Sequence, residues 1–168
     1  MELDIGAGSG SLVIKVAKKF SNSYLVGIDY WGKDWEYSKD QCSKNAILEG
    51  VNNRVEFIKA SASHLPFEEN DFDAVISCLT FHEVKDEKNK ILLIKEALRV
   101  IKPGSSFVFL DLFRDRKIFG DYEQFKDCLK ELTLTHLEFQ DLSSLIHLPK
   151  LLLQGKVLGN AVVIKGKK

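Results

Sequence analysis

Residues 1–11, which read MELDIGAGSGS, constrain the fold more than any other stretch of the chain. A short apolar run carries one acid, Asp4, and breaks into a glycine-rich turn, after which an amphipathic segment begins at Leu12. This order predicts a strand, a tight turn and a helix. Glycine tolerates the φ values of such a turn, and its missing Cβ lets a ligand approach the backbone. The N-terminus of the following helix offers unpaired N–H groups and partial positive charge, which favour a nucleotide-like ligand.

A second acid, Asp29, follows the next apolar run at residues 24–28, where a second strand is expected. A carboxylate at the tip of the second strand of such a unit suits hydrogen bonding to the two hydroxyls of a ribose. Charge-assisted hydrogen bonds of this kind contribute roughly 1.5–3 kcal/mol each. A helix cap is the alternative role for Asp29.

The spacing of the glycines separates two classes of ligand. Dinucleotide-binding turns read G-x-G-x-x-G/A, which counted from Gly6 requires a small residue at position 11, and Ser11 nearly satisfies it. The third glycine is Gly10, however, so the turn reads G-x-G-x-G behind an acid two residues before its first glycine. An NAD-dependent oxidoreductase is therefore the less favoured interpretation.

The segment Asp4-Ile5-Gly6-Ala7-Gly8-Ser9-Gly10 resembles the first motif of the class I S-adenosylmethionine-dependent methyltransferases. Two further segments strengthen the resemblance. Phe72-Asp73-Ala74-Val75 matches the FD-x-V pattern of the family, and residues 97–104, ALRVIKPG, resemble a segment of its small-molecule branch. The resemblance covers residues 1–113 by motif and the C-terminal third by pattern alone.

The resemblance implies one domain over residues 1–168, built as a three-layer αβα, Rossmann-like doubly wound sheet. The expected strand order is 3-2-1-4-5-7-6, mostly parallel with an antiparallel last strand. A chain of 168 residues is long enough for one such core. Hydrophobic patterning predicts strands at residues 3–5, 24–28, 55–58, 72–78, 107–112, 134–139 and 157–164. It predicts helices at residues 12–20, 35–48, 89–101 and 122–132, with Asp34 capping the second and Pro103-Gly104 ending the third.

Two groups of apolar residues each have more than one possible role. We expect the leucine-rich stretch at residues 145–153 to lie in the core, with a substrate wall or a partner surface as alternatives. We expect Trp31 and Trp35 to pack under the following helix, with contact to the substrate as the alternative.

The family resemblance also implies a cofactor site at the loops that follow the first four strands. Asp29 would hold the ribose hydroxyls, and Tyr30 would pack on adenine. Many relatives carry an aspartate where this chain has Ser61, so a hydroxyl without charge would face the adenine amino group. The N–H of Ala62 would meet an adenine ring nitrogen, and the carbonyl of Cys78 would accept from the amino group of the cofactor. The full set of expected cofactor-binding residues is Asp4, Gly6, Ala7, Gly8, Gly10, Asp29, Tyr30, Ser61, Ala62 and Cys78.

The segment after the fourth strand is where the methyl group and its acceptor are expected to meet, because open α/β sheets bind ligands beyond the carboxyl ends of their strands. It contains His82, a candidate catalytic base or substrate-orienting group whose charge is tunable near neutral pH. Packing within the loop is the alternative role for His82, and Glu83 would either orient it or face solvent. The four histidines are scattered without metal-ligand spacing, so no metal site is predicted.

Composition limits the partners. The chain has 24 basic and 24 acidic residues, so no overall field attracts nucleic acid or an anionic membrane, and a macromolecular acceptor is less favoured than a small molecule. No run is long enough to span a membrane, and the N-terminus has no signal-peptide pattern. Three widely spaced cysteines without C-x-x-C predict reduced thiols and a cytoplasmic location.

The function that follows is transfer of a methyl group from S-adenosylmethionine to a small-molecule acceptor by in-line displacement, with S-adenosylhomocysteine as product. The family carries helices before its first strand, whereas this sequence enters that strand directly. We therefore expect a shallow, exposed cleft that a homodimer would cover. A catalytically silent S-adenosylmethionine-binding or scaffold domain is the alternative.

Overall fold

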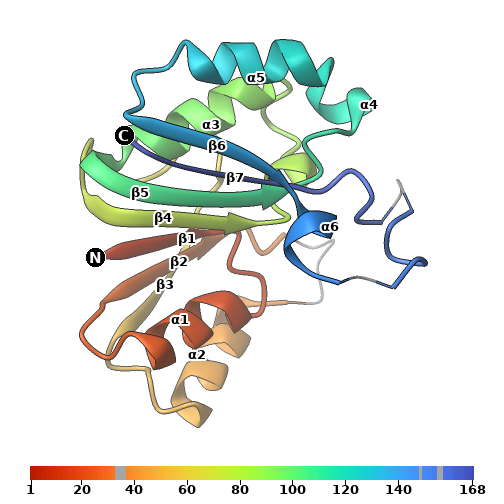
Figure 1. Ribbon diagram of the computed structural model, residues 1–168. Coiled ribbons are helices and arrows are strands. Elements are labelled where there is room, and N and C mark those ends of the chain that lie inside the picture. The colour runs from red at the N-terminus through yellow and green to blue at the C-terminus, as the bar shows by residue number, and fades with distance from the viewer. Residues whose placement is uncertain (33–36, 148, 155–156) are drawn as a thin grey trace.

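A computed structural model describes residues 1–32, 37–147, 149–154 and 157–168. These residues form one seven-stranded sheet of order β3-β2-β1-β4-β5-β7-β6, which confirms the predicted order (Figure 1). Five neighbouring strands run parallel, in the order β3, β2, β1, β4 and β5. Strand β7 lies antiparallel to β5 and to β6. The strands are β1 (Glu2–Ile5), β2 (Leu25–Asp29), β3 (Val55–Lys59), β4 (Phe72–Cys78), β5 (Ile101–Asp111), β6 (His136–Asp141) and β7 (Val162–Lys167).

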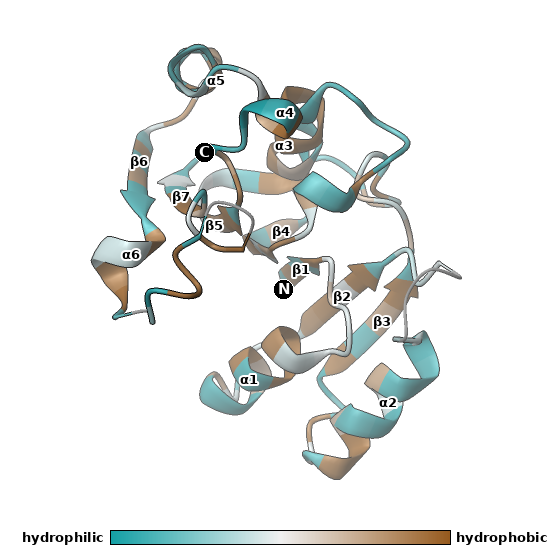
Figure 2. Cartoon of the chain, turned by 90° about the vertical axis from the view of Figure 1, so that its right-hand side faces the viewer, coloured by the Kyte–Doolittle hydropathy of each residue, from teal (hydrophilic) through white to brown (hydrophobic). Residues whose placement is uncertain are grey.

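Helices cover both faces of the sheet and complete the expected three layers. Figure 1 shows α1 and α2 on one side and α3, α4 and α5 on the other. The helices are α1 (Ser11–Lys19), α2 (Lys39–Leu48), α3 (Lys90–Arg99), α4 (Arg116–Phe119), α5 (Tyr122–Lys130) and α6 (Leu142–Leu145), with a 3₁₀ turn, η1, at Phe81–Glu83. In α1 the buried side chains Val13, Ile14 and Ala17 share one face, and the hydrophilic face of that helix is visible in Figure 2. This amphipathic pattern fixes the helix on the sheet.

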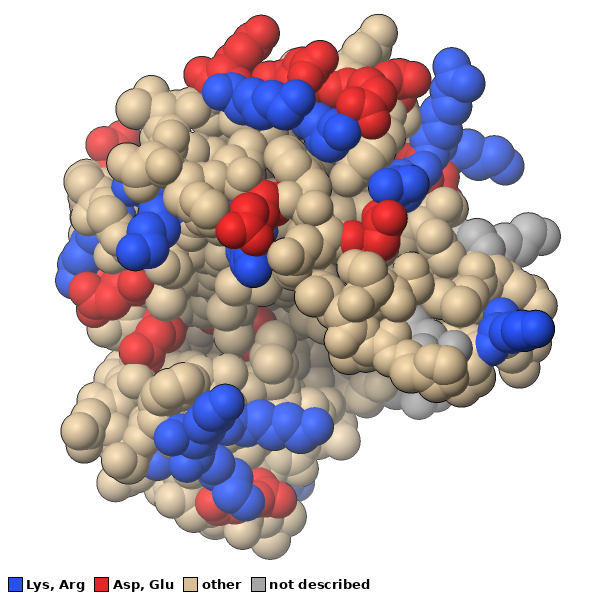
Figure 3. All heavy atoms as spheres, viewed as in Figure 1, with Lys and Arg blue, Asp and Glu red and all other residues tan. Residues whose placement is uncertain are grey.

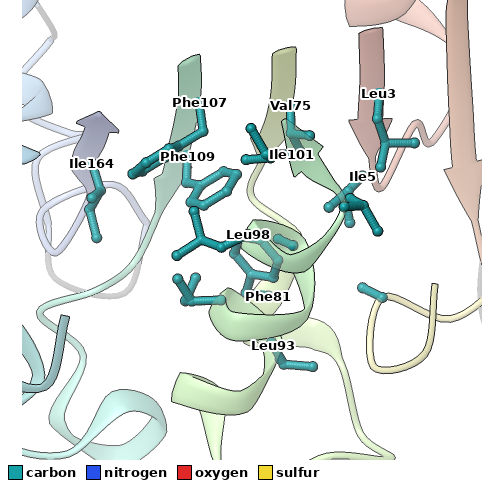
Figure 4. Packing of buried hydrophobic residues seen from close by; sticks show 14 of the residues in the cluster. Leu3, Ile5, Val75, Phe81, Leu93, Leu98, Ile101, Phe107, Phe109 and Ile164 are labelled. Atoms are coloured by element: carbon teal, nitrogen blue, oxygen red, sulfur yellow. The ribbon is translucent and has the colours of Figure 1, made fainter. Parts of the chain in front are cut away.

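Two hydrophobic clusters hold the layers together. Figure 4 shows the larger one, in which Phe81, from the segment after β4, packs among residues of the central strands. Its ring meets Phe109 edge-on with centroids 5.3 Å apart. Fully burying such a side chain contributes about 1.5–3 kcal/mol. The segment that follows β4 is thus anchored to the core, and this anchor positions the residues on either side of Phe81.

The second helix starts later than the sequence pattern predicts. We expected it from residue 35 with Asp34 as N-cap, but α2 begins at Lys39. Ser38 has extended backbone angles, and its hydroxyl accepts a hydrogen bond from the N–H of Gln41, so Ser38 is the N-cap. Asp34 and Trp35 lie outside the described residues.

Pro103 and Gly104 do not end a helix, contrary to the prediction. Helix α3 ends at Arg99, and β5 begins at Ile101 and continues through both residues. The pairing of β5 with β4 passes directly from Ile101 to Ser106, so Pro103 lies in an irregular stretch of the strand. A proline has no N–H to donate, and such a stretch tolerates it.

The described residues of the leucine-rich stretch are largely exposed and not part of the core, so that prediction is wrong. It lies between β6 and β7, at the end of the sheet where β5 also ends (Figure 1). Leu151 is 71% exposed, and Leu145 and Ile146 are about half exposed. Helix α6 reaches only Leu145, and β7 starts at Val162. Among the described residues, no helix has the length and apolar character needed to cross a membrane.

Arg99, from the ALRVIKPG segment, fixes the connection between β3 and β4. Its guanidinium donates to the carboxylate of Glu96 at 2.8 Å and to the backbone carbonyls of Phe67 at 2.9 Å and Leu65 at 3.2 Å. Planar guanidinium groups suit several such contacts at once. The motif thus holds the loop that forms one wall of the site described next.

Candidate cofactor-binding site

A cavity of about 560 Å³ opens at the carboxyl ends of the parallel strands. This end of the sheet faces the viewer in Figure 2. Its volume falls within the range of about 300–1,000 Å³ that is usual for small-molecule sites. The loops after β1, β2, β3 and β4 all contribute to its walls, as the sequence analysis predicts. The lining residues are Gly6, Gly8, Ile28, Asp29, Tyr30, Trp31, Gly32, Tyr37, Ala60, Ser61, Ala62, Cys78, Leu79, Thr80, Glu83, Val84, Lys85 and Asp86.

The glycine loop lets the backbone itself form part of the wall. Gly6 has φ +83°, and a Cβ there would overlap the side chain of Thr80. Gly8 has φ +55° and no heavy atom within 4 Å of the position where its Cβ would lie. Both angles favour glycine. Gly6 is therefore required by the neighbouring loop, whereas Gly8 leaves open space beside the backbone.

The amides of this loop donate hydrogen bonds inside the protein. The N–H groups of Gly6 and Ala7 both donate to the carbonyl of Ile28 at 2.8 Å. The N–H of Gly8 donates to Asp29 Oδ2 at 2.9 Å. These three amides already donate within the protein. The loop therefore lets a ligand lie close to its backbone, but these three N–H groups are not free to donate to that ligand.

Asp29 links the first two loops of the site. Its Oδ2 accepts from Gly8, and its Oδ1 accepts from the N–H of Trp31 at 3.0 Å. The indole N–H of Trp31 in turn donates to the carbonyl of Gly8 at 2.8 Å. A carboxylate has about four lone-pair positions, so Asp29 keeps acceptor capacity toward the cavity. Trp31 is buried in the smaller cluster with Cys42 and Ala46 of α2, as expected, and it also lines the cavity; its contact with a substrate stays a prediction.

Asp4 lies buried near the end of the central strand. Neither of its carboxylate oxygens has a hydrogen-bond partner among the described residues. Burial raises the pKa of Asp4 to about 7; the nearby N–H of Val13 opposes this shift, and the charge of Asp29 adds to it. An unpaired buried carboxylate is costly. Asp4 is therefore suited to a positively charged partner.

The loop after β3 presents both polar and apolar groups. The hydroxyl of Ser61 donates to Asp86 Oδ2 at 2.7 Å. Within the described residues, the N–H of Ala62 has no protein acceptor. Tyr30, from the neighbouring loop, is 64% exposed, and the Lys59 ammonium lies 5.6 Å from its ring centroid. An exposed ring and a free amide are thus available on this side of the cavity.

The loop after β4 is organised by Asp111, a fully buried residue at the end of β5 that the sequence analysis did not select. Its Oδ2 accepts from the N–H groups of Thr80 at 3.1 Å and Phe81 at 2.7 Å. Its Oδ1 lies 2.6 Å from Nδ1 of His82. An acid ending an apolar strand was the signal that identified Asp29, and the same signal marks Asp111.

His82 lies behind the cavity wall, between two carboxylates. Besides the contact with Asp111, its Nε2 lies 3.2 Å from Oε1 of Glu83. The hydrogen bond that His82 donates to Asp111 raises the pKa of His82 above its ordinary value; the charges of Asp111 and Glu83 add to this, while burial and Lys90 oppose it. His82 is absent from the lining residues, whereas Glu83 belongs to them. The geometry therefore places Glu83 between His82 and the cavity.

The predicted cofactor residues divide into two groups. The structure brings seven of them to the cavity wall, namely Gly6, Gly8, Asp29, Tyr30, Ser61, Ala62 and Cys78. Burial raises the pKa of the Cys78 thiol. Asp4, Ala7 and Gly10 are not lining residues; a Cβ at Gly10 would meet the ring of Phe57 at 3.1 Å, so Gly10 permits close packing.

In the described part of the chain, no group of three or more His, Cys, Asp or Glu residues is arranged to hold a metal ion. Charges of both signs are spread over the surface. Figure 3 shows lysines over α1 and intermixed acids and bases over α5.

Comparison with known proteins identifies the family. Residues 3–109 match the family described as "Methyltransferase domain". The chain belongs to the class I S-adenosylmethionine-dependent methyltransferases. This methyltransferase chain is 34% identical over 128 residues to a ubiquinone/menaquinone biosynthesis C-methyltransferase from Rickettsia prowazekii, covering 73% of this chain and 49% of the relative. It spans less than half the length of the first curated relatives, namely 40%, 46% and 49%.

Solved structures share the fold of this methyltransferase chain at low sequence identity. The [4+2]-cyclase SpnF superposes with a TM-score of 0.74 at 20% identity, over 99% of this chain and 74% of the other. Geranyl diphosphate C-methyltransferase from Streptomyces coelicolor, solved with Mg²⁺, geranyl diphosphate and S-adenosyl-L-homocysteine, gives 0.73 at 14% identity, over 99% and 70% of the two chains.

Proposed function

We propose that this chain binds S-adenosylmethionine in the cavity described above and transfers its methyl group to a small-molecule acceptor, leaving S-adenosylhomocysteine. The observation that carries the proposal is the position of the Asp29 carboxylate. It lies on the wall of a cavity of about 560 Å³, held by the backbone of the glycine loop. The family membership supports the cofactor, and the geometry supports its place.

The described residues fit the adenosine part of the cofactor. Asp29 retains lone pairs for the two ribose hydroxyls, because its hydrogen bonds with the N–H groups of Gly8 and Trp31 use only part of its acceptor capacity. The exposed ring of Tyr30 suits packing on adenine, and the unpaired N–H of Ala62 suits an adenine ring nitrogen. The backbone carbonyl of Cys78 is assigned to the amino group of the cofactor.

Asp4 suits the positively charged ammonium group of the cofactor. Its two oxygens have no hydrogen-bond partner among the described residues, and burial raises its pKa to about 7. An ammonium group near the glycine loop would compensate the negative charge of Asp4. Gly8 leaves the backbone accessible and Gly6 makes room for the side chain of Thr80, while Ala7 and Gly10 shape the loop from behind.

When bound, S-adenosylmethionine supplies an electrophilic methyl group. The chain then has to hold the acceptor in line with that group, and such positioning lowers a barrier by about 7–11 kcal/mol in favourable cases. We assign His82 to the catalytic machinery as a positioning residue. It connects buried Asp111 to Glu83, and Glu83 would receive the proton that the acceptor loses.

The acceptor is proposed to be small and largely apolar. Leu79 and Val84 line the cavity beside Glu83, and the exposed leucines of residues 145–153 lie at the same end of the sheet. The names of two related proteins refer to a quinone pathway and to geranyl diphosphate, which supports an apolar acceptor for this chain. A cytoplasmic location and a homodimer that covers the cleft belong to the same proposal.

A catalytically silent cofactor-binding or scaffold domain is the second candidate. The exposure of two cavity residues favours it: Tyr30 is 64% exposed and Tyr37 is 44% exposed. A site open to water orients an acceptor poorly. Methyl transfer distinguishes the two functions, because a silent domain would bind the cofactor without turnover.

Titration calorimetry with S-adenosylmethionine, S-adenosylhomocysteine and NAD tests the proposed cofactor. We expect the first two to bind and NAD not to bind, and Asp29→Ala to abolish binding. Asp127→Asn, a change on the exposed face of α5, is the control that keeps wild-type affinity. Incubation of a cell extract with methyl-labelled S-adenosylmethionine then tests transfer. Absence of binding by the unaltered chain would contradict the proposal.

A further inference from the structure

Asp86 supplies a carboxylate at the point of the cavity where Ser61 lacks one. It lies between η1 and α3, lines the cavity, and was not among the residues selected from the sequence. Its Oδ2 accepts from the hydroxyl of Ser61 at 2.7 Å and from the hydroxyl of Ser63 at 2.7 Å. The loop after β3 and the loop after β4 therefore meet at this single oxygen, through serines that lie 25 and 23 residues before Asp86 in the chain.

The position of this carboxylate follows from side-chain geometry. Serine Oγ and aspartate Cγ occupy the same place for the same χ1 rotamer. An aspartate at position 61 would accordingly have its carboxyl carbon where Ser61 Oγ lies. Asp86 Oδ2 is 2.7 Å from that point, so its negative charge stands within one hydrogen-bond length of the charge that an aspartate at position 61 would carry.

The carboxylate is ionised and has room for another donor. Hydrogen bonds from Ser63 and Ser61 hold the pKa of Asp86 below its ordinary value, and the charge of Lys90 acts in the same direction, while burial opposes them. A carboxylate accepts at about four positions, and the two hydroxyls fill two of them. An amino group in the cavity would find a charged acceptor there.

The segment that carries Asp86 is fixed on both sides. The ammonium of Lys90, a buried residue, donates to the carbonyl of Val84 and to the carbonyl of Glu87 at 3.1 Å. The side chain of Glu87 accepts from the N–H of Asn89 at 2.6 Å. These contacts hold the backbone before and after Asp86, and the two serines hold its side chain.

We propose that Asp86 accepts a hydrogen bond from the exocyclic amino group of adenine and so selects 6-aminopurine over 6-oxopurine ligands. The inference rests on the proposed cofactor and adds a specificity residue to it. In this chain the charge that recognises the purine belongs to Asp86, in the loop after β4, and the hydroxyls of Ser61 and Ser63 orient its carboxylate. A purine with a carbonyl oxygen at position 6 would face the carboxylate with a second acceptor and bind weakly.

The test compares S-adenosylhomocysteine with S-inosylhomocysteine by titration calorimetry. The two ligands differ at one edge of the purine: the inosyl ligand carries a carbonyl oxygen at position 6 and a hydrogen on N1, so only the part of the preference that Asp86→Asn removes reports on Asp86. We expect the unaltered chain to prefer S-adenosylhomocysteine by about tenfold or more, the size expected for one charge-assisted hydrogen bond. Asp86→Asn should reduce that preference several-fold, since an amide donates to a carbonyl as readily as it accepts from an amino group; the preference that remains belongs to the N1 contact. Asp127→Asn is the matched control and should keep the preference.

Two further variants distinguish recognition from a structural role. The exchange Ser61→Asp with Asp86→Ser moves the carboxylate to the position that is usual in the family, and it should restore the preference. Ser61→Ala with Ser63→Ala keeps Asp86 but removes its two orienting hydroxyls, and it should reduce the preference. The double variant Ser61→Ala with Ser63→Ala also tests the proposal if Asp86→Asn does not fold.

The outcomes separate the two proposals. If the unaltered chain binds S-adenosylhomocysteine without preference, or Asp86→Asn keeps the full preference while folded, Asp86 does not read the purine and the proposed cofactor still stands. If the unaltered chain binds neither S-adenosylhomocysteine nor S-adenosylmethionine, the proposed function is wrong and the role of Asp86 is wrong with it.

Discussion

Three buried or partly buried aspartates at strand ends differ in how fully their oxygens are paired. Asp111 accepts from several amides and contacts His82, and Asp29 accepts from two amides. Asp4 has no partner among the described residues. Since an unpaired buried carboxylate costs folding free energy, Asp4 is where stability and ligand binding are most strongly opposed.

The first prediction concerns Asp4→Asn. Because the folded-state pKa is about 7 and the ordinary value is 3.8, folding takes up a proton between these values, and stability falls as pH rises through this window. We expect the variant to melt a few degrees higher than the unaltered chain at pH 8 and to show little advantage at pH 4. Thermal melts across this range check it.

The same variant should bind S-adenosylhomocysteine at least several-fold more weakly at pH 8, because the compensating negative charge is lost. Equal affinity in the two chains would remove Asp4 from the cofactor site.

The second prediction concerns His82→Gln. The pKa of His82 is raised in the folded chain, so its contribution to stability is fully present below about 6.5, its ordinary value, and is lost as pH rises through the folded-state value. The melting temperatures of the variant and the unaltered chain should therefore differ most below about pH 6.5 and converge as the pH rises through the folded-state pKa of His82.

Turnover of His82→Gln on an identified acceptor should fall by about 10²-fold, the low end for loss of acid–base assistance, mainly in kcat. Unchanged turnover with the predicted stability profile would show that His82 has a structural role only.

At the scale of elements, the loop after β4 depends on a neighbouring strand. Asp111, at the end of β5, receives the first amides of η1, and Phe81 places its ring in the core. The loop that carries Glu83 is thus positioned by tertiary contacts across 30 residues of chain.

Asp111→Asn tests this dependence. Removing the charged acceptor of two buried amides should destabilise the chain by roughly 1–3 kcal/mol. Hydrogen exchange should accelerate at the amides of Thr80 and Phe81, while the amides of β1 change only as much as global stability does. Uniform acceleration throughout the sheet would mean that Asp111 does not act on this loop in particular.

The order of the elements was predictable because local signals agree with it: a glycine turn, an acid that ends β2, and apolar runs of strand length. The contacts of Asp86 and Asp111 were not predictable, since hydrogen bonds that join residues 25 to 30 positions apart leave no periodic pattern. Pro103-Gly104 was misread because the same pair that ends helices also fits an irregular strand.

At the scale of the whole molecule, stability is concentrated between the sheet and its covering helices. Leu93 is fully buried in the larger cluster, whereas Leu151, in the leucine-rich stretch, is 71% exposed. The apolar composition of residues 145–153 did not predict that Leu151 is exposed, because burial depends on where the β6–β7 connection leaves the sheet.

The two leucines form a matched pair of tests. Leu93→Ala should cost about 2–5 kcal/mol, as large-to-small changes in a core do. Leu151→Ala should change the free energy of unfolding by less than about 0.5 kcal/mol. Denaturant titration measures both, and a cost above 2 kcal/mol at Leu151 would show that this side chain is buried in solution.

The hydrogen bond from the Trp31 indole to the backbone of Gly8 has a practical consequence. It fixes a fluorophore on the cavity wall, at 2.8 Å from the glycine loop. The chain has two tryptophans, so Trp35→Phe leaves Trp31 as the sole emitter. A nucleoside that enters the cavity should alter the intensity and wavelength of that emission. Ligand binding can therefore be screened by intrinsic tryptophan fluorescence, without an added dye.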